Sequence, residues 1–196
     1  MVNRQLSIVT CSRILSRMQT NLLPSEYVVV DVETTGFKPE EGHVVVEVAA
    51  QKIKGASVVG QYQSLVKADR PMPPECTKIS GIDDALLLRE GKAVLTVFPQ
   101  LREFIGMSVL IGHNVPFDIG FLNSHFRKLN LQLLVNQTLD TLELSRRYLI
   151  IPSYSLESVA RYLKIPQPVA HRAMADVDTT RQVFLKLIER ARALGR

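Results

Sequence analysis

The sequence predicts an α/β domain in which helices cover a mixed β-sheet. Three observations indicate this fold class. Apolar, valine-rich segments follow one another within residues 26–67. A short turn joins the last two of these segments, as in an antiparallel hairpin. Beyond residue 83, helical and strand-like patterns alternate, which is typical of a sheet with helices packed on it.

The first half of the chain contains the predicted hairpin. Residues 26–33, "EYVVVDVE", form a short apolar strand that "TTGFKP" ends. "HVVVEVAAQKIKG" (43–55) and "VVGQYQSLVK" (58–67) are the next two strands, and "KGAS" between them predicts an antiparallel pair. "DRPMPPE" (69–75) is expected to be a loop, because its prolines would interrupt a strand or a helix.

The second half alternates between helices and short strands. Helices are expected at 83–90, 96–106, 116–130 and 155–165, and a long one from Ala173 to about Leu194. Asn114 is a plausible cap for the helix at 116–130. Short strands are expected at 108–113 and within 136–144, where the second runs into a helix.

Composition limits the classes of function. The 196 residues suit one domain at 26–196 with an extension at 1–25. The net charge of +5 fits a polyanionic partner without establishing one. Cys11 and Cys76 lie far apart, so we expect neither a disulfide framework nor a cysteine zinc site, and a reducing compartment such as the cytoplasm. No apolar run approaches the ~18 residues of a membrane helix.

Residues 1–25 allow two interpretations. They contain Arg4, Arg13 and Arg17, several serines and no acid, which is the composition of an organellar transit peptide. The same segment forms an amphipathic helix in which the apolar positions are Leu6, Val9, Ile14, Leu15 and Met18. We expect a helical extension that precedes the domain.

Two carboxylates stand at the end of the first apolar strand. Side chains alternate across a strand, so Asp31 and Glu33 share a face. Their mutual repulsion is relieved if one holds a proton or if a cation binds between them. Carboxylates are hard ligands that suit magnesium or manganese. The alternative is that one acid caps the "TTG" turn and the other reaches solvent.

Two later segments carry further candidates. In "IGHNVPFD", Asp118 falls in the first turn of a helix, where it acts either as a ligand or as a favourable charge at the helix dipole. In "HRAMADVDTT", His171 precedes Asp176 by five positions, so the two cannot share a helix face. We therefore expect His171 on the preceding loop and Asp176 on the helix. Asp178 is expected to point elsewhere.

These three segments together resemble the motifs of the DnaQ-like (DEDDh) 3'–5' exonuclease family. "DVETTG", "GHNVPFD" and "HRAMADV" match the first, second and third motifs, and the resemblance runs from about residue 26 to about residue 190. The chain is similar to the proofreading exonucleases of bacterial DNA polymerase III, the epsilon subunit and the PolC exonuclease domain. The resemblance implies a ribonuclease H-like fold: a five-stranded mixed sheet, its first three strands antiparallel, flanked by helices.

The resemblance also implies an activity. It is metal-dependent hydrolysis from the 3' end of DNA, at single-stranded or mismatched ends, which releases nucleoside monophosphates in proofreading or repair. Asp31, Glu33, Asp118 and Asp176 would hold two Mg²⁺ or Mn²⁺ ions, with Asp31 bridging both. His171 would accept the proton of the attacking water.

Substrate contacts are expected around the first two motifs. Backbone amides at Thr34, Thr35 and Gly36 would meet the terminal nucleotide. Phe37 would stack on a base, or it covers the sheet edge as a turn aromatic. Candidates to line the path of the strand are His113 and Asn114, unless Asn114 serves only as a helix cap.

Two other functions stay open from the sequence. An exoribonuclease of the same fold, similar to ribonuclease T or oligoribonuclease, would share the same five catalytic positions. A catalytically silent nucleic-acid-binding module is a candidate from another class. Possible partners are a DNA polymerase and a sliding clamp, the latter because "QLREF" (100–104) resembles a clamp-binding pentapeptide.

Overall fold

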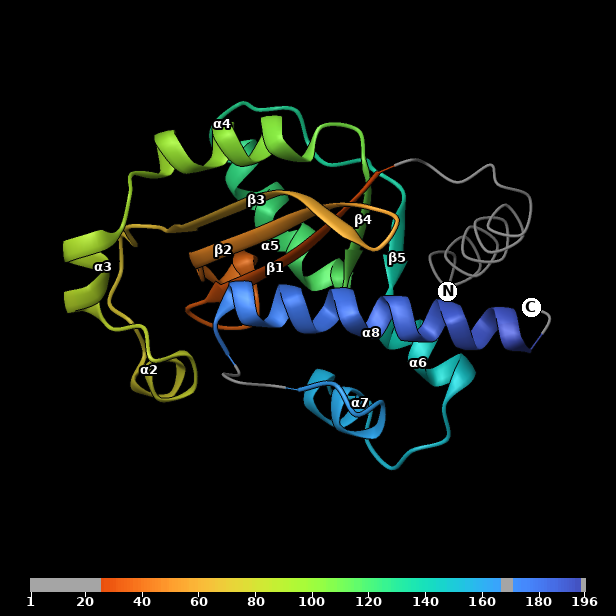
Figure 1. The fold of residues 1–196 in the computed structure, drawn as a ribbon. Helices are drawn as coiled ribbons and strands as arrows, with labels where there is room; N and C mark the ends of the chain where they lie inside the picture. The colour runs from red at the N-terminus through yellow and green to blue at the C-terminus, as the bar shows by residue number, and fades with distance from the viewer. Residues whose placement is uncertain (1–25, 167–170, 195–196) are drawn as a thin grey trace.

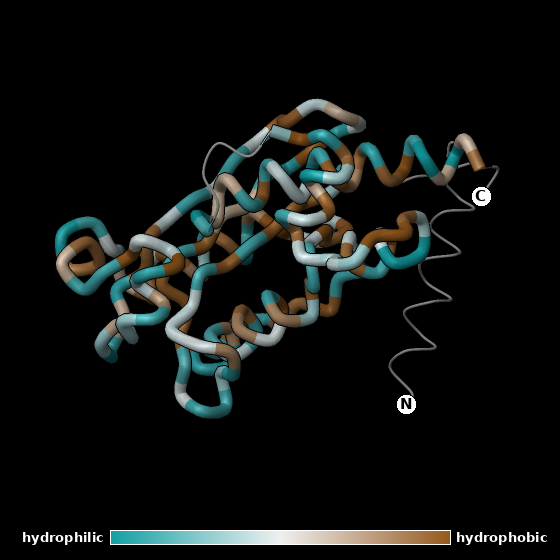
Figure 2. The backbone as a smooth tube through the Cα atoms, turned by 90° about the horizontal axis from the view of Figure 1, so that it is seen from below, coloured by the Kyte–Doolittle hydropathy of each residue, from teal (hydrophilic) through white to brown (hydrophobic). Residues whose placement is uncertain are grey.

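The structure is a computed structural model that describes residues 26–166 and 171–194. The helical extension predicted for residues 1–25 lies outside the described residues. Within the described part of the chain, no helix is both long enough and apolar enough to cross a membrane. The longest helix changes between hydrophilic and hydrophobic residues repeatedly along its length (Figure 2).

A five-stranded sheet in the order β3-β2-β1-β4-β5 forms the centre of the molecule (Figure 1). The strands are β1 (Tyr27–Thr34), β2 (Val45–Lys54), β3 (Ser57–Leu65), β4 (Val109–Gly112) and β5 (Thr138–Asp140). β1, β2 and β3 pair antiparallel, whereas β4 and β5 join parallel to β1 and to each other. The predicted mixed sheet with three antiparallel strands is confirmed.

Alternation along β1 sends its side chains into two separate layers. Val28, Val30 and Val32 pack in one apolar cluster with α4 (Val94–Ile105) and α5 (Val115–Lys128). Tyr27 and Val29 face the other cluster, which α6 (Thr141–Tyr148), α7 (Leu156–Tyr162) and α8 (Ala173–Ala193) complete. Because the period of a strand is two residues, Asp31 and Glu33 continue the face that α8 covers.

Two short helices at one end of the sheet complete the fold. α2 (Pro74–Ser80) and α3 (Asp84–Glu90) accompany a small cluster of Val46, Met72, Ile82 and Leu87. The prediction of a loop through residue 75 was wrong at its end, because α2 begins at Pro74. Proline fits the first position of a helix, where no intrahelical N–H bond is lost. A short 3₁₀ helix, η1 (Pro39–Glu41), follows β1.

The segment that resembles a clamp-binding peptide is part of the core. Residues 100–104 lie within α4, and Leu101 is fully buried against the sheet. Phe104 packs beside Tyr62 of β3, with 6.0 Å between the ring centroids. The segment is therefore not presented as an exposed peptide.

β1 extends beyond β4. Parallel pairing with β4 covers only Tyr27–Val29, although β1 continues to Thr34. The backbone of β1 beyond Val29 is therefore open on that side, and the N-terminal turn of α5 fills the space. Polar groups gather at this end of the sheet, where β4 and β5 also end and helices begin.

Candidate active site

Three acids from the two ends of the chain meet beside β1. Carboxylate oxygens of Asp31, Glu33 and Asp176 all lie within 4.8 Å of one another. β1 supplies the first two, and the first turn of α8 supplies the third. Asp176 lies more than a hundred residues beyond Asp31 and Glu33 in the sequence, so the fold brings it to them.

Asp118 stands next to this cluster and is almost completely buried, with 4% of its surface exposed. Its Oδ1 accepts a hydrogen bond from the backbone N–H of Val32 at 3.1 Å. That N–H lies on the part of β1 that β4 does not cover. The charge of Asp118 is the strongest of the neighbouring charges that raise the pKa of Asp31. Asp118 is therefore a neighbour of the three clustered acids, although its oxygens are not among those that lie within 4.8 Å of one another.

The pKa values of all four acids are raised. Burial is the first cause for Asp31, whose pKa lies well above its usual range, and the charges of Asp118, Glu33, Asp176 and Glu47 add to it. Burial and the nearby Asp176 and Glu47 raise the pKa of Glu33 to about 7. Burial likewise raises the pKa of Asp118 and of Asp176, although hydrogen bonds from backbone N–H groups oppose it. Without a cation, the four negative charges destabilise one another.

The donor set fits divalent metal ions. All the converging atoms are carboxylate oxygens, which are ligands of hard cations such as Mg²⁺ and Mn²⁺. Among the described residues, the ion pairs involve none of Asp31, Glu33, Asp118 and Asp176. The charge of the cluster is therefore available to a metal ion rather than balanced by lysine or arginine contacts.

His171 lies directly before α8, as predicted, and Asp176 lies in the first turn of that helix. The backbone of His171 has a positive φ of 60°, and its N–H donates to Asp176 Oδ2 at 3.1 Å. This bond closes the loop against the helix and holds His171 beside the acids. The side chain of His171 is exposed, so solvent and substrate have access to the imidazole.

A family model described as "Exonuclease" matches residues 28–184, a span that contains all five predicted catalytic positions. This chain belongs to the exonuclease family. The resemblance to DnaQ-like exonucleases is thereby confirmed.

Relatives of this exonuclease include subunits of bacterial DNA polymerase III. It is 31% identical over 174 residues to the epsilon subunit of Aquifex aeolicus, covering 88% of this chain and 85% of the relative. It is 34% identical over 174 residues to the PolC-type polymerase of Caldanaerobacter subterraneus subsp. tengcongensis, covering 88% of this chain. The chain spans only 12% of the length of that relative.

A solved structure shows the same architecture. The zinc-bound form of the E. coli exonuclease I complex with single-stranded DNA superposes with a TM-score of 0.78 at 21% identity. The match covers 87% of this chain and 42% of that chain. The predicted ribonuclease H-like fold is confirmed. That structure contains a bound zinc ion. In this chain, the carboxylate cluster described above offers oxygen ligands that suit a divalent metal ion.

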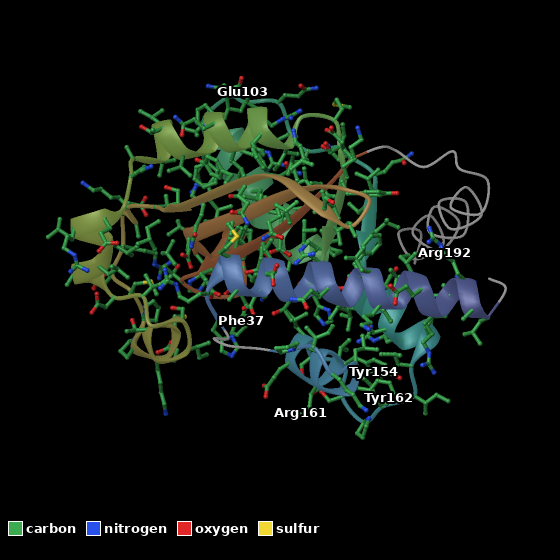
Figure 3. All side chains as sticks on the ribbon, in the orientation of Figure 1. Phe37, Glu103, Tyr154, Arg161, Tyr162 and Arg192 are labelled. Atoms are coloured by element: carbon green, nitrogen blue, oxygen red, sulfur yellow. The ribbon has the colours of Figure 1, made fainter. Side chains whose placement is uncertain are left out.

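The residues predicted to contact the substrate differ in exposure and in the contacts that they make within the fold. Phe37 is 84% exposed and projects near the N-terminal end of α8 in the view of Figure 3. Thr35 is fully buried, and its N–H and hydroxyl both bond to Val44. The amide of Thr35 is thus occupied within the fold. Gly36 is required by packing, because a Cβ there would lie 2.4 Å from the ring of His43.

His113 and Asn114 serve the loop between β4 and α5. The ring nitrogens of His113 bond to the hydroxyl of Thr141 at 2.9 Å and to the carbonyl of Tyr154 at 2.8 Å. Asn114 occupies the N-cap position with a left-handed φ of 69°, but its side chain makes no capping bond, so the predicted side-chain cap was wrong. Instead its N–H donates to Asp140 Oδ1 at 2.8 Å. The Asn114 side chain is exposed.

Three further polar residues lie outside the cluster of acids: Asp178, His125 and Glu47. Asp178 pairs with Arg181 and Gln182 on α8, away from the cluster. His125 is buried and accepts a hydrogen bond from the N–H of Val45. Glu47, which the sequence analysis did not single out, is fully buried next to the site. The available signal was an acid inside the apolar strand "VVVEVAA", the same anomaly that marked Asp31.

Proposed function

We propose that this chain is a metal-dependent 3'–5' exonuclease that hydrolyses phosphodiester bonds from the 3' end of DNA. The substrates would be single-stranded or mismatched ends, and the products nucleoside monophosphates. The convergence of Asp31, Glu33 and Asp176 within 4.8 Å, with Asp118 and His171 beside them, carries this proposal. Membership of the exonuclease family supports it.

Asp31, Glu33, Asp118 and Asp176 would hold two divalent ions, Mg²⁺ or Mn²⁺. Such ions, when bound, supply charge stabilisation for the attacking and leaving oxygens of a phosphodiester. The protein contributes the positions of the oxygens. β1 fixes Asp31 and Glu33 through its pairing with β2, and the bond to Val32 orients Asp118.

His171 would accept the proton of the attacking water. Its imidazole is exposed, while its backbone is tied to Asp176. A general base must stand within reach of the water and also of the solvent that removes the proton afterwards. The exposed position of His171 on the loop before α8, next to Asp176, supports this role.

Phe37 would stack on a base of the strand, because an aromatic ring with 84% exposure is free to contact a nucleotide face. The backbone at Thr34 and Gly36 and the exposed side chain of Asn114 would complete the path. Thr35 and His113 would act indirectly, by fixing the loops that carry these groups.

DNA is proposed as the substrate because the relatives are subunits of a DNA polymerase and the structural neighbour is bound to single-stranded DNA. For the same reason, a replicative polymerase is the proposed protein partner, to be tested by co-purification.

The cytoplasm is the proposed location, in line with the wide spacing of Cys11 and Cys76.

A single assay tests the proposed function. Single-stranded DNA, matched duplex, duplex with a 3' mismatch, and RNA of the same sequence would each carry a 5' label. We expect a ladder of products that shortens from the 3' end in Mg²⁺ or Mn²⁺ and disappears with chelator. DNA should be degraded faster than RNA. A protein that cleaves none of these substrates in Mn²⁺ would contradict the proposal, and preference for RNA would reassign the substrate.

A further inference from the structure

Glu47 on β2 is a buried carboxylate that the proposed chemistry does not use. The antiparallel register pairs it directly with Glu33 on the neighbouring strand. Its side chain is only 1% exposed. A buried charge at this place adds to the repulsion in the site, so it requires a specific compensation.

Four hydrogen bonds provide this compensation. Arg172 donates Nη2 to Glu47 Oε1 at 2.9 Å and Nε to Oε2 at 3.1 Å, which is a two-pronged guanidinium–carboxylate contact. Gln63 donates to Oε1 at 3.0 Å, and the backbone N–H of Ala173 donates to Oε2 at 3.1 Å. Burial raises the pKa of Glu47, but these bonds outweigh burial and lower it overall.

The bond to Ala173 shows what Glu47 does for α8. Ala173 is the first residue of that helix, and its N-cap, Arg172, makes no capping bond with its own side chain. A carboxylate from β2 therefore takes the place of a local cap and also complements the helix dipole. The bond to Glu47 thus attaches the start of α8 to the sheet, beside the contact in which Gln51 on β2 donates to the sulfur of Met174 at 3.7 Å.

The residues on either side of this attachment belong to the active site. His171 directly precedes Arg172. Asp176 lies in the first turn of α8, three residues after Ala173. We propose that Glu47 and Arg172 form a positioning pair that fixes the first turn of α8, so that Asp176 and His171 reach the acids of β1. This inference rests on the proposed function and adds two residues to it, both of which would act through the position of α8.

α8 does not need this pair in order to fold. Its 21 residues carry a buried stripe that includes Val177, Val183, Phe184, Leu187 and Ile188. Gln51 on β2 also accepts a hydrogen bond from Arg181 of this helix. Loss of Glu47 or Arg172 should therefore loosen the first turn of α8 while the rest of the helix stays packed.

The test compares Glu47→Gln, Arg172→Gln and Arg172→Lys with the wild type. Lysine retains the positive charge but not the two-pronged contact, so Arg172→Lys separates geometry from charge. Arg102→Gln is the matched control, because Arg102 also makes several hydrogen bonds but lies on α4, on the opposite face of the sheet. Calorimetry measures Mn²⁺ binding without DNA, and rates are measured as a function of Mn²⁺ concentration.

We expect all three variants to weaken Mn²⁺ binding roughly 10–100-fold, the usual effect of removing a group that orients a metal ligand. Their exonuclease rates should recover as Mn²⁺ is raised, whereas Arg102→Gln should match the wild type. Full rescue by lysine would show that charge alone suffices and would overturn the proposal. A lower melting temperature with unchanged Mn²⁺ affinity would overturn it as well, because the pair would then be structural only.

Failure of the proposed function would look different. In that case the wild type would bind Mn²⁺ but cleave no nucleic acid, and the calorimetric comparison would still decide whether the pair positions Asp176. Should Glu47→Gln not fold, Arg172→Lys alone carries the same comparison.

Discussion

Asp118 on α5 accepts a hydrogen bond from the backbone N–H of Val32, the residue that separates Asp31 from Glu33. One carboxylate thus fixes α5 to β1 beside the two acids that we propose as metal ligands. Its other oxygen does not take part in this bond and is available to a metal ion.

Replacing Asp118 by asparagine should separate these two roles. The amide oxygen of Asp118→Asn can still accept the N–H of Val32, so the fold should persist. The rate should fall about 10²-fold or more, because a metal-bound carboxylate contributes several kcal/mol to stabilisation of the transition state. Steady-state kinetics with single-stranded DNA measures this. Asp178→Asn, which changes an acid outside the cluster, should leave the rate unaltered.

Mn²⁺ should stabilise the protein against heat. The four acids repel one another in the metal-free protein, and a bound cation removes that repulsion while binding only the folded state. Asp31→Asn should raise the melting temperature of the metal-free protein and abolish the increase that Mn²⁺ causes. Differential scanning calorimetry with and without Mn²⁺ measures both. An unchanged response of this variant to Mn²⁺ would show that Asp31 is not a ligand.

His125 should make the stability depend on pH. Burial lowers the pKa of His125 to about 4 from an ordinary value of 6.5. The unfolded chain therefore binds a proton more readily between these values, so stability is complete above about pH 6.5 and declines as the pH falls towards 4. The loss amounts to about 3 kcal/mol.

Comparison with His125→Gln isolates this effect, since glutamine can accept the N–H of Val45 without titrating. The acids contribute equally to both proteins. The difference between the unfolding free energies of the wild type and the variant should therefore change by about 3 kcal/mol between pH 6.5 and pH 4. Urea titrations at several pH values measure it. A difference that does not vary with pH would show that the imidazole of His125 is not held neutral in the folded protein.

Phe37→Ala should weaken substrate binding without affecting the fold. Its ring is 84% exposed, so little packing is lost. Loss of base stacking would cost about 1–3 kcal/mol, and KM for single-stranded DNA should rise accordingly. Ile150→Ala is the control, because Ile150 is 97% exposed and lies outside the predicted path. Equal KM values for the two variants would indicate that Phe37 only covers the turn.

His171→Ala should retain Mn²⁺ binding but lose rate by roughly 10²–10⁴, the usual contribution of a general base. Mn²⁺ calorimetry and single-turnover kinetics separate the two effects. Full activity of this variant would remove His171 from the mechanism.

The sequence predicted the strands and most helices well, because apolar periodicity is a local property. Asp31 and Glu33 were recognised because charges inside a valine-rich strand conflict with burial. α2 was missed at Pro74, since the same proline that ends one pattern also begins a helix. The helix Pro74–Ser80 was therefore absent from the prediction.

The hydrogen-bond partners of Glu47 and Asn114 could be found only in the tertiary structure. The partners of Glu47 lie on β3 and at the start of α8, far along the chain, so no local pattern could reveal them. Asn114 looked like a helix cap, but its left-handed backbone turns the N–H towards Asp140 and leaves the side chain outside. The roles of both residues depend on contacts between segments that lie far apart in the sequence.

The pairing register of β1 with β2 decides both packing and chemistry. A slip by one residue would turn every side chain of β1 to the opposite face. Asp31 and Glu33 would then enter the apolar cluster that packs against α4 and α5, and Val28, Val30 and Val32 would turn to the other face. Burial of two unpaired charges would destabilise the misaligned chain. Asp31 and Glu33 therefore also favour the correct register of their own strand.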